Sequence, residues 1–286
     1  MDNAQSRAAR MTDTQLLRRL PHTRSFTQVL GRGLLVFLLT VQGVSAFALI
    51  TLGVMLTKFR VARQAIAPLV RQQIARAGVQ LLPMFAFISI VLGLLVIGQS
   101  VALQNRIGAV EFLGNIMAVV IVRELGPLLA ALLVLARVGT AIVVELGTAR
   151  AMGEIESLEA LGIDPVHYLV VPRVIGMALG IFSLTVYLII GSLVSGYVWA
   201  FIQGVPLLPG DYFNQLAGAL NYMDFILLAL KTCGFGFIIA IVTCYHGLAQ
   251  PIRVEEVSRA TVRAVAQGTI ACILLDALFI VIYLAI

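Results

Sequence analysis

The sequence is poor in charged residues. Lys, Arg, Asp and Glu make up only 12% of its 286 residues, whereas a soluble domain carries about 25%. Hydrophobic residues make up 60%, and the mean hydropathy is +1.01. This composition excludes an ordinary soluble domain and indicates a protein that crosses a membrane several times.

Cysteine, histidine and lysine are also scarce. The three cysteines (Cys233, Cys244 and Cys272) lie in apolar runs without a CxxC pair, so we interpret them as packing residues, not as disulfides or metal ligands. Neither of the two lysines follows the glycines of a Walker A motif, and the three histidines do not cluster. We therefore expect no enzyme active site, no metal and no cofactor, and any ATP must be hydrolysed by a partner.

The net charge of +6 does not indicate nucleic-acid binding, because the basic residues flank apolar runs and suit an anionic membrane surface. Six stretches are long and apolar enough to span a membrane, which takes about 20 residues. They are Leu34–Met55, Leu81–Leu103, Phe112–Ala136, Val174–Ala200, Phe225–Tyr245 and Ala264–Ile286.

Basic residues decide which stretches span. Both flanks of Leu34–Met55 are basic, and a single span cannot place both in the cytoplasm. We expect this stretch to be an interfacial or re-entrant helix, followed by a basic surface helix at Phe59–Gly78. The other five stretches alternate, with the N-terminus inside and the C-terminus outside. One alternative is six spans. Another is a signal peptide cut near Ala48, which we do not expect because the sequence starts at Met1.

The predicted fold is thus an all-α integral membrane protein without internal repeats. Residues 1–80 form an N-terminal cytoplasmic segment with interfacial helices, and residues 81–286 form the transmembrane domain. The connection at 201–224 is long enough for a short outer helix. Aromatic residues mark the outer interface at Tyr197, Trp199, Phe201, Tyr212 and Phe213.

Two adjacent charges interrupt the third apolar stretch. In lipid, Arg123 and Glu124 would each cost about 2.5–3.5 kcal/mol, and adjacent helical residues point about 100° apart, so the two cannot readily neutralise each other. Gly126 and Pro127 follow, and proline loosens a helix because it lacks an N–H. A charge pair beside a helix break at bilayer depth indicates a transport path, and a structural ion-pair network is the alternative.

Two further charges lie within spans. We place Lys231 and Asp276 near opposite faces of the membrane and interpret Lys231 as snorkelling outward, with a role beside Arg123 and Glu124 as the alternative. For Asp276, local pairing and a cavity role stay open. Small residues that permit close helix approach, as at a subunit interface, occur at Gly126, Gly139 and Gly147.

The segment from Glu145 to Arg173 is acidic although it lies on the predicted inner side. Apolar residues at spacing three predict a short helix that ends at Gly162, and Asp164-Pro165 begins a new turn. The apolar positions are Met152, Ile155, Leu158 and Leu161, and the charged ones are Arg150, Glu154, Glu156, Glu159 and Asp164. The segment is either a contact site for a partner or a solvated loop helix.

Three ordered motifs resemble one known family. They are RELGPLLAALLVLARVG (Arg123–Gly139), the run ELG…R…E…LE.LGIDP…LVVPR (Glu145–Arg173) and SRATVRAV (Ser258–Val265). Together they are similar to the MlaE/YrbE permeases, the membrane subunits of MCE-associated ABC transporters for phospholipids and other lipids. The similarity runs from about Gly31 to the C-terminus.

This resemblance implies an elbow helix, five transmembrane helices and a coupling helix at Met152–Asp164 that binds an ATPase. It implies a homodimer in a bacterial inner membrane with two cytoplasmic ABC ATPase subunits, a periplasmic MCE protein and often a STAS-domain protein. Such a complex maintains outer-membrane lipid asymmetry or imports lipids. The rival functions are an ion-coupled secondary transporter and a non-transporting anchor for a periplasmic partner.

Two groups of candidate site residues follow from these motifs and from the charges within the spans. The lipid cavity would include Arg123, Glu124, Gly126, Pro127 and Asp276. The coupling to the ATPase would use Arg150, Gly153, Glu154, Glu156, Ser157, Glu159, Gly162, Asp164 and Pro165.

Overall fold

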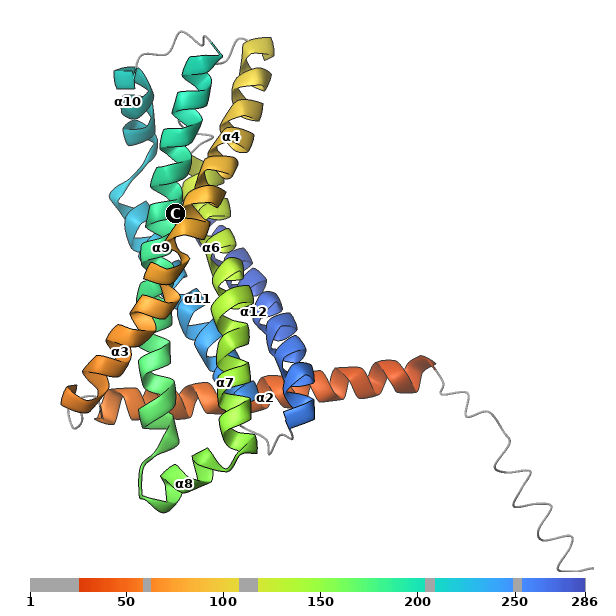
Figure 1. Ribbon diagram of the computed structural model, residues 1–286. Helices are drawn as coiled ribbons and strands as arrows, with labels where there is room; N and C mark the ends of the chain where they lie inside the picture. Colours follow the sequence, from red (N-terminus) through yellow and green to blue (C-terminus); the bar gives the residue numbers. More distant parts are fainter. Residues whose placement is uncertain (1–25, 59–62, 108–117, 204–208, 249–253, 286) are drawn as a thin grey trace, which may run out of the picture. The chain divides into compact units, whose positions relative to one another are not determined.

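The computed structural model describes residues 26–58, 63–107, 118–203, 209–248 and 254–285 (Figure 1). These residues are built from helices and contain no strand, which confirms the all-α membrane fold. The chain divides into two compact units, Met1–Ala46 and Phe47–Ile286. Helix α2 (Phe26–Lys58) begins in the first unit and ends in the second.

The remaining elements all belong to the second unit. Three of them, η3, η4 and η5, are π-helical, and η1 and η6 are short 3₁₀ turns. In chain order they are α3 (Arg63–Ala77), η1 (Val79–Leu81), α4 (Leu82–Ile107), η3 (Ala118–Leu125), α6 (Gly126–Val134), η4 (Leu135–Gly139), α7 (Thr140–Ala151), α8 (Glu154–Ala160), η5 (Val166–Val170), α9 (Val171–Ile202), α10 (Pro209–Ala219), α11 (Tyr222–Leu248), η6 (Val254–Glu256) and α12 (Val257–Ala285).

Six helical segments of the described chain are long and apolar enough to cross a membrane. Five of them overlap the five predicted spans, although residues 112–117 of the Phe112–Ala136 stretch and Ile286 lie outside the described residues. The sixth, Thr40–Thr57 in α2, buries only 6% of its residues. The predicted basic surface helix corresponds to α3, apart from residues 59–62, which are also outside the described range.

Helix α9 forms the centre of the second unit, where it packs against α3, α4, α6 and α11. Glycine makes the closest of these contacts possible. A Cβ on Gly93 of α4 would overlap the carbonyl oxygen of Ser192, and one on Gly236 of α11 would overlap the backbone of Ala178. Both helices therefore approach α9 backbone to backbone, as small residues allow in membrane helix bundles.

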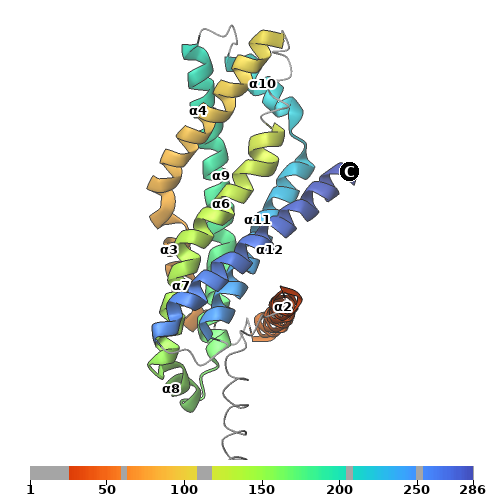
Figure 2. The same cartoon turned by 90° about the vertical axis from the view of Figure 1, so that its right-hand side faces the viewer.

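Helix α10 confirms the predicted short helix between the spans at 174–200 and 225–245. Tyr212 of α10 is buried in a hydrophobic cluster with Ile121 and Leu193, and its ring lies 5.3 Å from that of Tyr197. Burial raises the pKa of Tyr212 to about 12, so its hydroxyl stays protonated and donates to the Leu193 carbonyl at 3.4 Å. In Figures 1 and 2, α10 and α8 lie at opposite ends of this unit.

The second half of α2 contacts the α8 end of the bundle. The ring of Phe47 lies 6.0 Å from that of Tyr245, which is in the last turn of α11. Phe47 is near the middle of the apolar stretch Leu34–Met55, so the middle of this stretch meets the end of a spanning helix. The predicted packing role fits Cys244 and Cys272, which are buried, whereas Cys233 is partly exposed.

Candidate functional site

The predicted helix break at Gly126-Pro127 is not found, because the helix continues through both residues, but Pro127 leaves one backbone carbonyl for another partner. Pro127 has no N–H, so it cannot donate the α-helical hydrogen bond to the carbonyl oxygen of Arg123, four residues earlier. The chain is π-helical up to Leu125, and the Nζ of Lys231 donates to the Arg123 oxygen at 2.8 Å. An ammonium group from α11 thus replaces the missing backbone donor.

Lys231 is completely buried and bridges two carboxylates. Its Nζ lies 3.2 Å from Glu124 Oε2 and 2.6 Å from Asp276 Oδ1. The prediction that Lys231 snorkels outward, near the opposite face from Asp276, is therefore wrong. Helices α11 and α12 run antiparallel: Lys231 lies nine residues after the start of α11 and Asp276 nine residues before the end of α12, which brings the two to the same depth.

Arg123 has a different partner from Glu124, as the divergence of adjacent helical side chains predicts. Its Nε and Nη2 lie 3.0 and 3.1 Å from Oδ1 and Oδ2 of Asp224, which is a two-pronged pair. The backbone N–H of Asn221 also donates to Asp224 Oδ2, at 2.8 Å. The guanidinium lies over the ring of Tyr283, 5.3 Å from its centroid.

We call Arg123, Glu124, Asp224, Lys231 and Asp276 the ion cluster. When all five groups are ionised, two cations face three carboxylates, for a net charge of −1. Asp224, Lys231 and Asp276 are at most 10% exposed, whereas Arg123 and Glu124 are 27% and 28% exposed. The cluster is therefore closed on the α11–α12 side and open at Arg123 and Glu124, where a polar group of a ligand can approach.

Sequence reasoning missed Asp224 and misjudged Lys231. Their spacing could have predicted a shared site. Asp224 and Lys231 are seven residues apart in an otherwise apolar helix, so they lie on the same helix face. Among the described residues, no three His, Cys, Asp or Glu side chains gather as metal ligands.

The three glycines expected at a subunit interface pack within the chain instead. A Cβ on Gly126 would press on Ile189, one on Gly139 on Thr243, and one on Gly147 on Val257. The subunit-interface interpretation of these glycines is wrong, because α6, η4 and α7 use them to pack against α9, α11 and α12 of the same chain.

The acidic segment forms a short helix between two left-handed glycines. Helix α8 covers Glu154–Ala160, and Gly153 and Gly162 have φ values of 77° and 75°, which L side chains rarely adopt. Asp164 lies beyond α8 and accepts a hydrogen bond from the N–H of Val166 at 3.0 Å, and Pro165 precedes η5. The predicted helix Met152–Asp164 is therefore shorter, because a glycine bounds it on each side.

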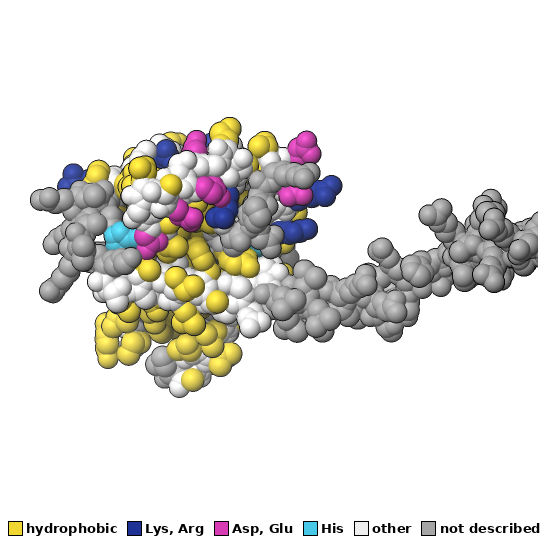
Figure 3. All heavy atoms as spheres, turned by 90° about the horizontal axis from the view of Figure 1, so that it is seen from below, with side chains coloured by type: hydrophobic (Ala, Val, Ile, Leu, Met, Phe, Trp, Pro, Cys, Tyr) yellow, Lys and Arg dark blue, Asp and Glu magenta, His cyan; other side chains and the backbone are white. Residues whose placement is uncertain are grey.

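One face of α8 is buried and the other is charged. Ile155 is buried, whereas Met152 and Leu161 are 66% and 76% exposed. All three glutamates of the helix are exposed, and Arg150 approaches one of them, Glu156, at 3.7 Å. Seen from this end of the molecule, acidic and basic side chains lie together on the surface (Figure 3). The Ser157 hydroxyl is bonded within the helix, to the carbonyl of Gly153 at 2.8 Å.

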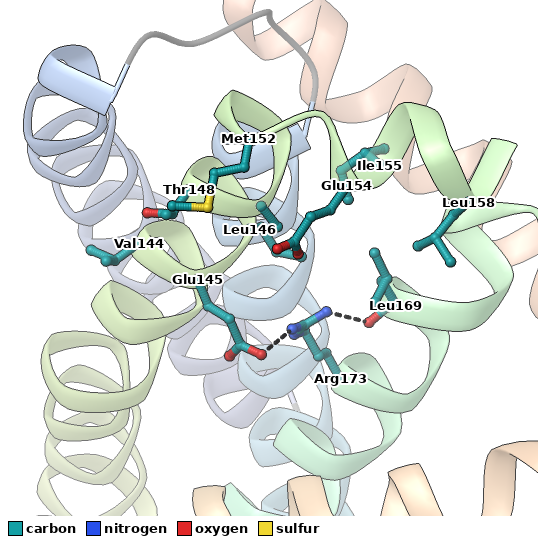
Figure 4. Close-up of a pocket in the computed structure, with 11 residues that line it drawn as sticks. Val144, Glu145, Leu146, Thr148, Met152, Glu154, Ile155, Leu158, Leu169 and Arg173 are labelled. Atoms are coloured by element: carbon teal, nitrogen blue, oxygen red, sulfur yellow. Dashed lines mark hydrogen bonds and ion pairs between the residues drawn. The ribbon is translucent and has the colours of Figure 1, made fainter. Parts of the chain in front are cut away.

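A cavity of about 450 Å³ lies between α7, α8 and the start of α9 (Figure 4). Glu145 and Arg173 point toward one another in it, with an N–O distance of 3.1 Å, and Arg173 also donates to the Leu169 carbonyl. The second Glu145 oxygen lies 3.2 Å from Arg76 of α3. Glu145 of α7 thus forms ion pairs with both α9 and α3.

Known proteins share this chain's pattern over most of its length. The family model described as Permease MlaE matches residues 70–282. A probable ABC transporter permease protein of Rickettsia prowazekii is 32% identical over 205 residues, which cover 71% of this chain and 78% of the relative. The intermembrane phospholipid transport system permease protein MlaE of Haemophilus influenzae is 29% identical over 73% of this chain and 80% of its own length.

Another relative comes from a plant. The chloroplastic protein TRIGALACTOSYLDIACYLGLYCEROL 1 of Arabidopsis thaliana is 28% identical over 72% of this chain and 58% of its own length. The matched region, residues 70–282, includes both the ion cluster and the α8 segment. Because this match covers well over half of the sequence, the chain belongs to the MlaE permease family and is a multi-pass membrane permease subunit of the ABC-transporter type.

Proposed function

We propose that this chain is the lipid-translocating subunit of an ATP-driven phospholipid transporter in a bacterial inner membrane. The observation that carries the proposal is the ion cluster, which lies within spanning helices and is open only at Arg123 and Glu124. Burying five charges among membrane helices is costly, and charged groups at this depth mark substrate or ion pathways. The name of the Haemophilus relative points to phospholipid as the substrate.

In this proposal a phospholipid headgroup binds at the open side of the cluster and the acyl chains lie against apolar helix faces. Arg123 offers a guanidinium edge to a phosphate, and Glu124 offers a carboxylate to a headgroup amine. The other three residues keep both side chains in place. The change from π-helix to α-helix at Gly126-Pro127 is the point where the segment that carries Arg123 and Glu124 can bend relative to the rest of the helix.

Coupling to ATP hydrolysis takes place at α8. Its exposed glutamates, Glu154, Glu156 and Glu159, and the exposed Met152 and Leu161 form an acidic surface with apolar edges. Such a surface fits a groove with basic and apolar walls on a cytoplasmic ABC ATPase. Gly153 and Gly162 fix the angle at which α8 leaves the bundle, so a movement of the ATPase reaches α7 and α9.

We assign the α8 end to the cytoplasm and the α10 end to the periplasm, with the N-terminus inside and the C-terminus outside. Five helices then span, and the part of α2 from Phe47 onward lies at the inner interface. Two observations support this placement. Basic residues flank α2 on both sides, and its Phe47 contacts Tyr245 in the last turn of α11, at the α8 end of the bundle. The proposed assembly is a homodimer with two ATPase subunits, a periplasmic MCE protein and a STAS-domain protein.

The test is lipid transfer by the complex purified with its ATPase and reconstituted in proteoliposomes. We expect the double variant Arg123→Gln/Glu124→Gln to bind the ATPase normally and to lose at least about tenfold in ATP-dependent transfer. Arg71→Gln, which removes an exposed arginine from α3, serves as the control and keeps the wild-type rate. Transfer at the wild-type rate by the double variant would remove the cavity role.

Two other outcomes of the same experiment favour the rival functions. Transfer that follows a proton gradient and ignores ATP and vanadate would indicate a secondary transporter that uses the ion cluster as a relay. Purification without any ATPase, together with no lipid transfer, would indicate a membrane anchor.

A further inference from the structure

A second polar cavity lies away from the ion cluster, between α3–η1 and η4–α7. Its volume is about 280 Å³. The polar lining residues are Gln73, Arg76, Gln80, Arg137 and Glu145, and the apolar ones are Leu81, Val138, Ala141 and Ile142. The transport role described above uses none of the arginines and glutamines of this lining.

The cavity lies at the depth of lipid headgroups. Gln80 of η1 directly precedes the apolar stretch Leu81–Leu103, and Arg137 directly follows the apolar stretch that ends at Ala136. In both helices, the first polar residue beyond the predicted apolar stretch therefore lines this cavity. Val79, beside Gln80, is 60% exposed, so an apolar side chain lies on the surface next to this lining residue.

The charges of the cavity are not balanced within the protein. Glu145 is shared by Arg76 at 3.2 Å and by the buried Arg173 at 3.1 Å, so two guanidinium groups already face one carboxylate. Arg137 is exposed, and among the described residues no acidic side chain pairs with it. The cavity therefore presents an excess of positive charge together with two amide side chains as additional hydrogen-bond partners.

We propose that this cavity binds the phosphodiester headgroup of an anionic phospholipid from the leaflet on the α8 side. A phosphate accepts hydrogen bonds from two guanidinium groups at once, and Arg76 and Arg137 come from opposite walls. Basic pockets between membrane helices on the cytoplasmic side are a known form of lipid recognition. The small volume admits a headgroup, and the acyl chains continue along the apolar surface outside.

The charge balance also selects among lipids. Phosphatidylglycerol carries one net negative charge and neutralises the excess. Phosphatidylethanolamine adds an ammonium group, which would meet Arg137 in the same cavity and be repelled. We therefore expect phosphatidylglycerol to bind about tenfold more tightly, the difference expected for one charge-assisted hydrogen bond.

The experiment is lipid titration of the purified full-length chain, followed by native mass spectrometry. Arg137→Gln is expected to lower the apparent affinity for one phosphatidylglycerol per chain about tenfold, to the level of phosphatidylethanolamine. Arg137→Lys, which keeps the charge but loses the planar fork, is expected to lie between the two. Arg71→Gln, an exposed arginine of α3 that does not line the cavity, is expected to change the affinity less than twofold.

Two results would overturn the proposal. Equal losses in Arg137→Gln and Arg71→Gln would show a diffuse basic surface instead of a site. Displacement of the lipid by millimolar inorganic phosphate would show a site for free anions. If Arg137→Gln cannot be purified in a folded form, Arg76→Gln removes the other guanidinium of the cavity and enters the same comparison. The readout is binding alone, so the result does not depend on lipid transport at the ion cluster.

Discussion

Replacement of Lys231 by methionine tests the structural role of the ion cluster. The Lys231 side chain is fully buried, and its Nζ contacts two carboxylates and the Arg123 carbonyl at 2.6–3.2 Å. Removing one partner of a buried ion pair costs about 3–5 kcal/mol, because the remaining charge keeps its desolvation penalty. Glu124 is 28% exposed and can turn toward solvent, so we expect the lower end of this range, about 3 kcal/mol.

The measurement is the free energy of unfolding by SDS in mixed micelles, followed by far-UV circular dichroism. Leu230→Met is the matched control, because Leu230 is the preceding residue of α11 and is 60% exposed; its cost should stay within about 0.5 kcal/mol. The double variant Lys231→Met/Asp276→Asn should cost about 2 kcal/mol less than the sum of the single variants, since it removes an unpaired buried carboxylate. Additive losses, or a Lys231→Met cost as small as that of the control, would refute the pairing.

The other predictions concern the Arg123–Asp224 pair, Pro127 and helix α8. Asp224→Asn removes the negative charge that pairs with Arg123, an interaction worth about 1.5–3 kcal/mol. We expect this variant to slow ATP-driven lipid transfer at least about tenfold. An unchanged rate would exclude the Arg123–Asp224 pair from transport. Pro127→Ala restores an N–H that competes with Lys231 for the Arg123 carbonyl, so thermal stability should rise while the rate of lipid transfer falls. A faster transfer would contradict a functional role of Pro127. Gly153→Ala should lower the free energy of unfolding by about 1–2 kcal/mol, because Gly153 has a φ of 77°, and should weaken ATPase binding in pull-downs. The control Gly218→Ala, whose new Cβ would meet open space, should have neither effect.

The spans could be predicted from sequence because they depend on composition alone. A run of about 20 apolar residues has one stable solution in lipid, a helix that satisfies its own backbone hydrogen bonds. Helix α8 could also be predicted, since Gly162 and the spacing of its apolar residues are local signals. Its start was not predicted, because the left-handed conformation of Gly153 depends on how the chain leaves α7.

The partners of the intramembrane charges could not be read from the sequence. Lys231 and Asp276 are 45 residues apart, and their contact depends on the relative depth of two antiparallel helices. That depth is set by side-chain packing, including the close contact of Gly236 with α9. The same limit explains why Gly126 was wrongly assigned to a subunit interface. A small residue predicts a close neighbour, but the sequence does not show whether that neighbour belongs to the same chain.

One run of helix joins the two candidate sites, and this connection limits how they can communicate. The chain is helical without interruption from Ala118, beside the ion cluster, to Ala151, where α8 begins to branch off. At 1.5 Å per residue this run is about 50 Å long, so it extends beyond a hydrocarbon core of about 30 Å. Two π-helical segments, η3 and η4, interrupt its regular hydrogen bonding.

A displacement of α8 must therefore travel along α7 before it reaches Arg123. Glu145 holds α7 to α3 and α9 through Arg76 and Arg173, so a small tilt of α8 alone would be resisted near the membrane surface. The π-helical η4, just above this point, is the place where the run can bend, since π-helical turns occur mainly as local irregularities at functional sites. At the far end Lys231 restrains the helix at the Arg123 carbonyl. We infer that lipid release requires this restraint to loosen, because a helix held at both ends cannot change the opening at Glu124.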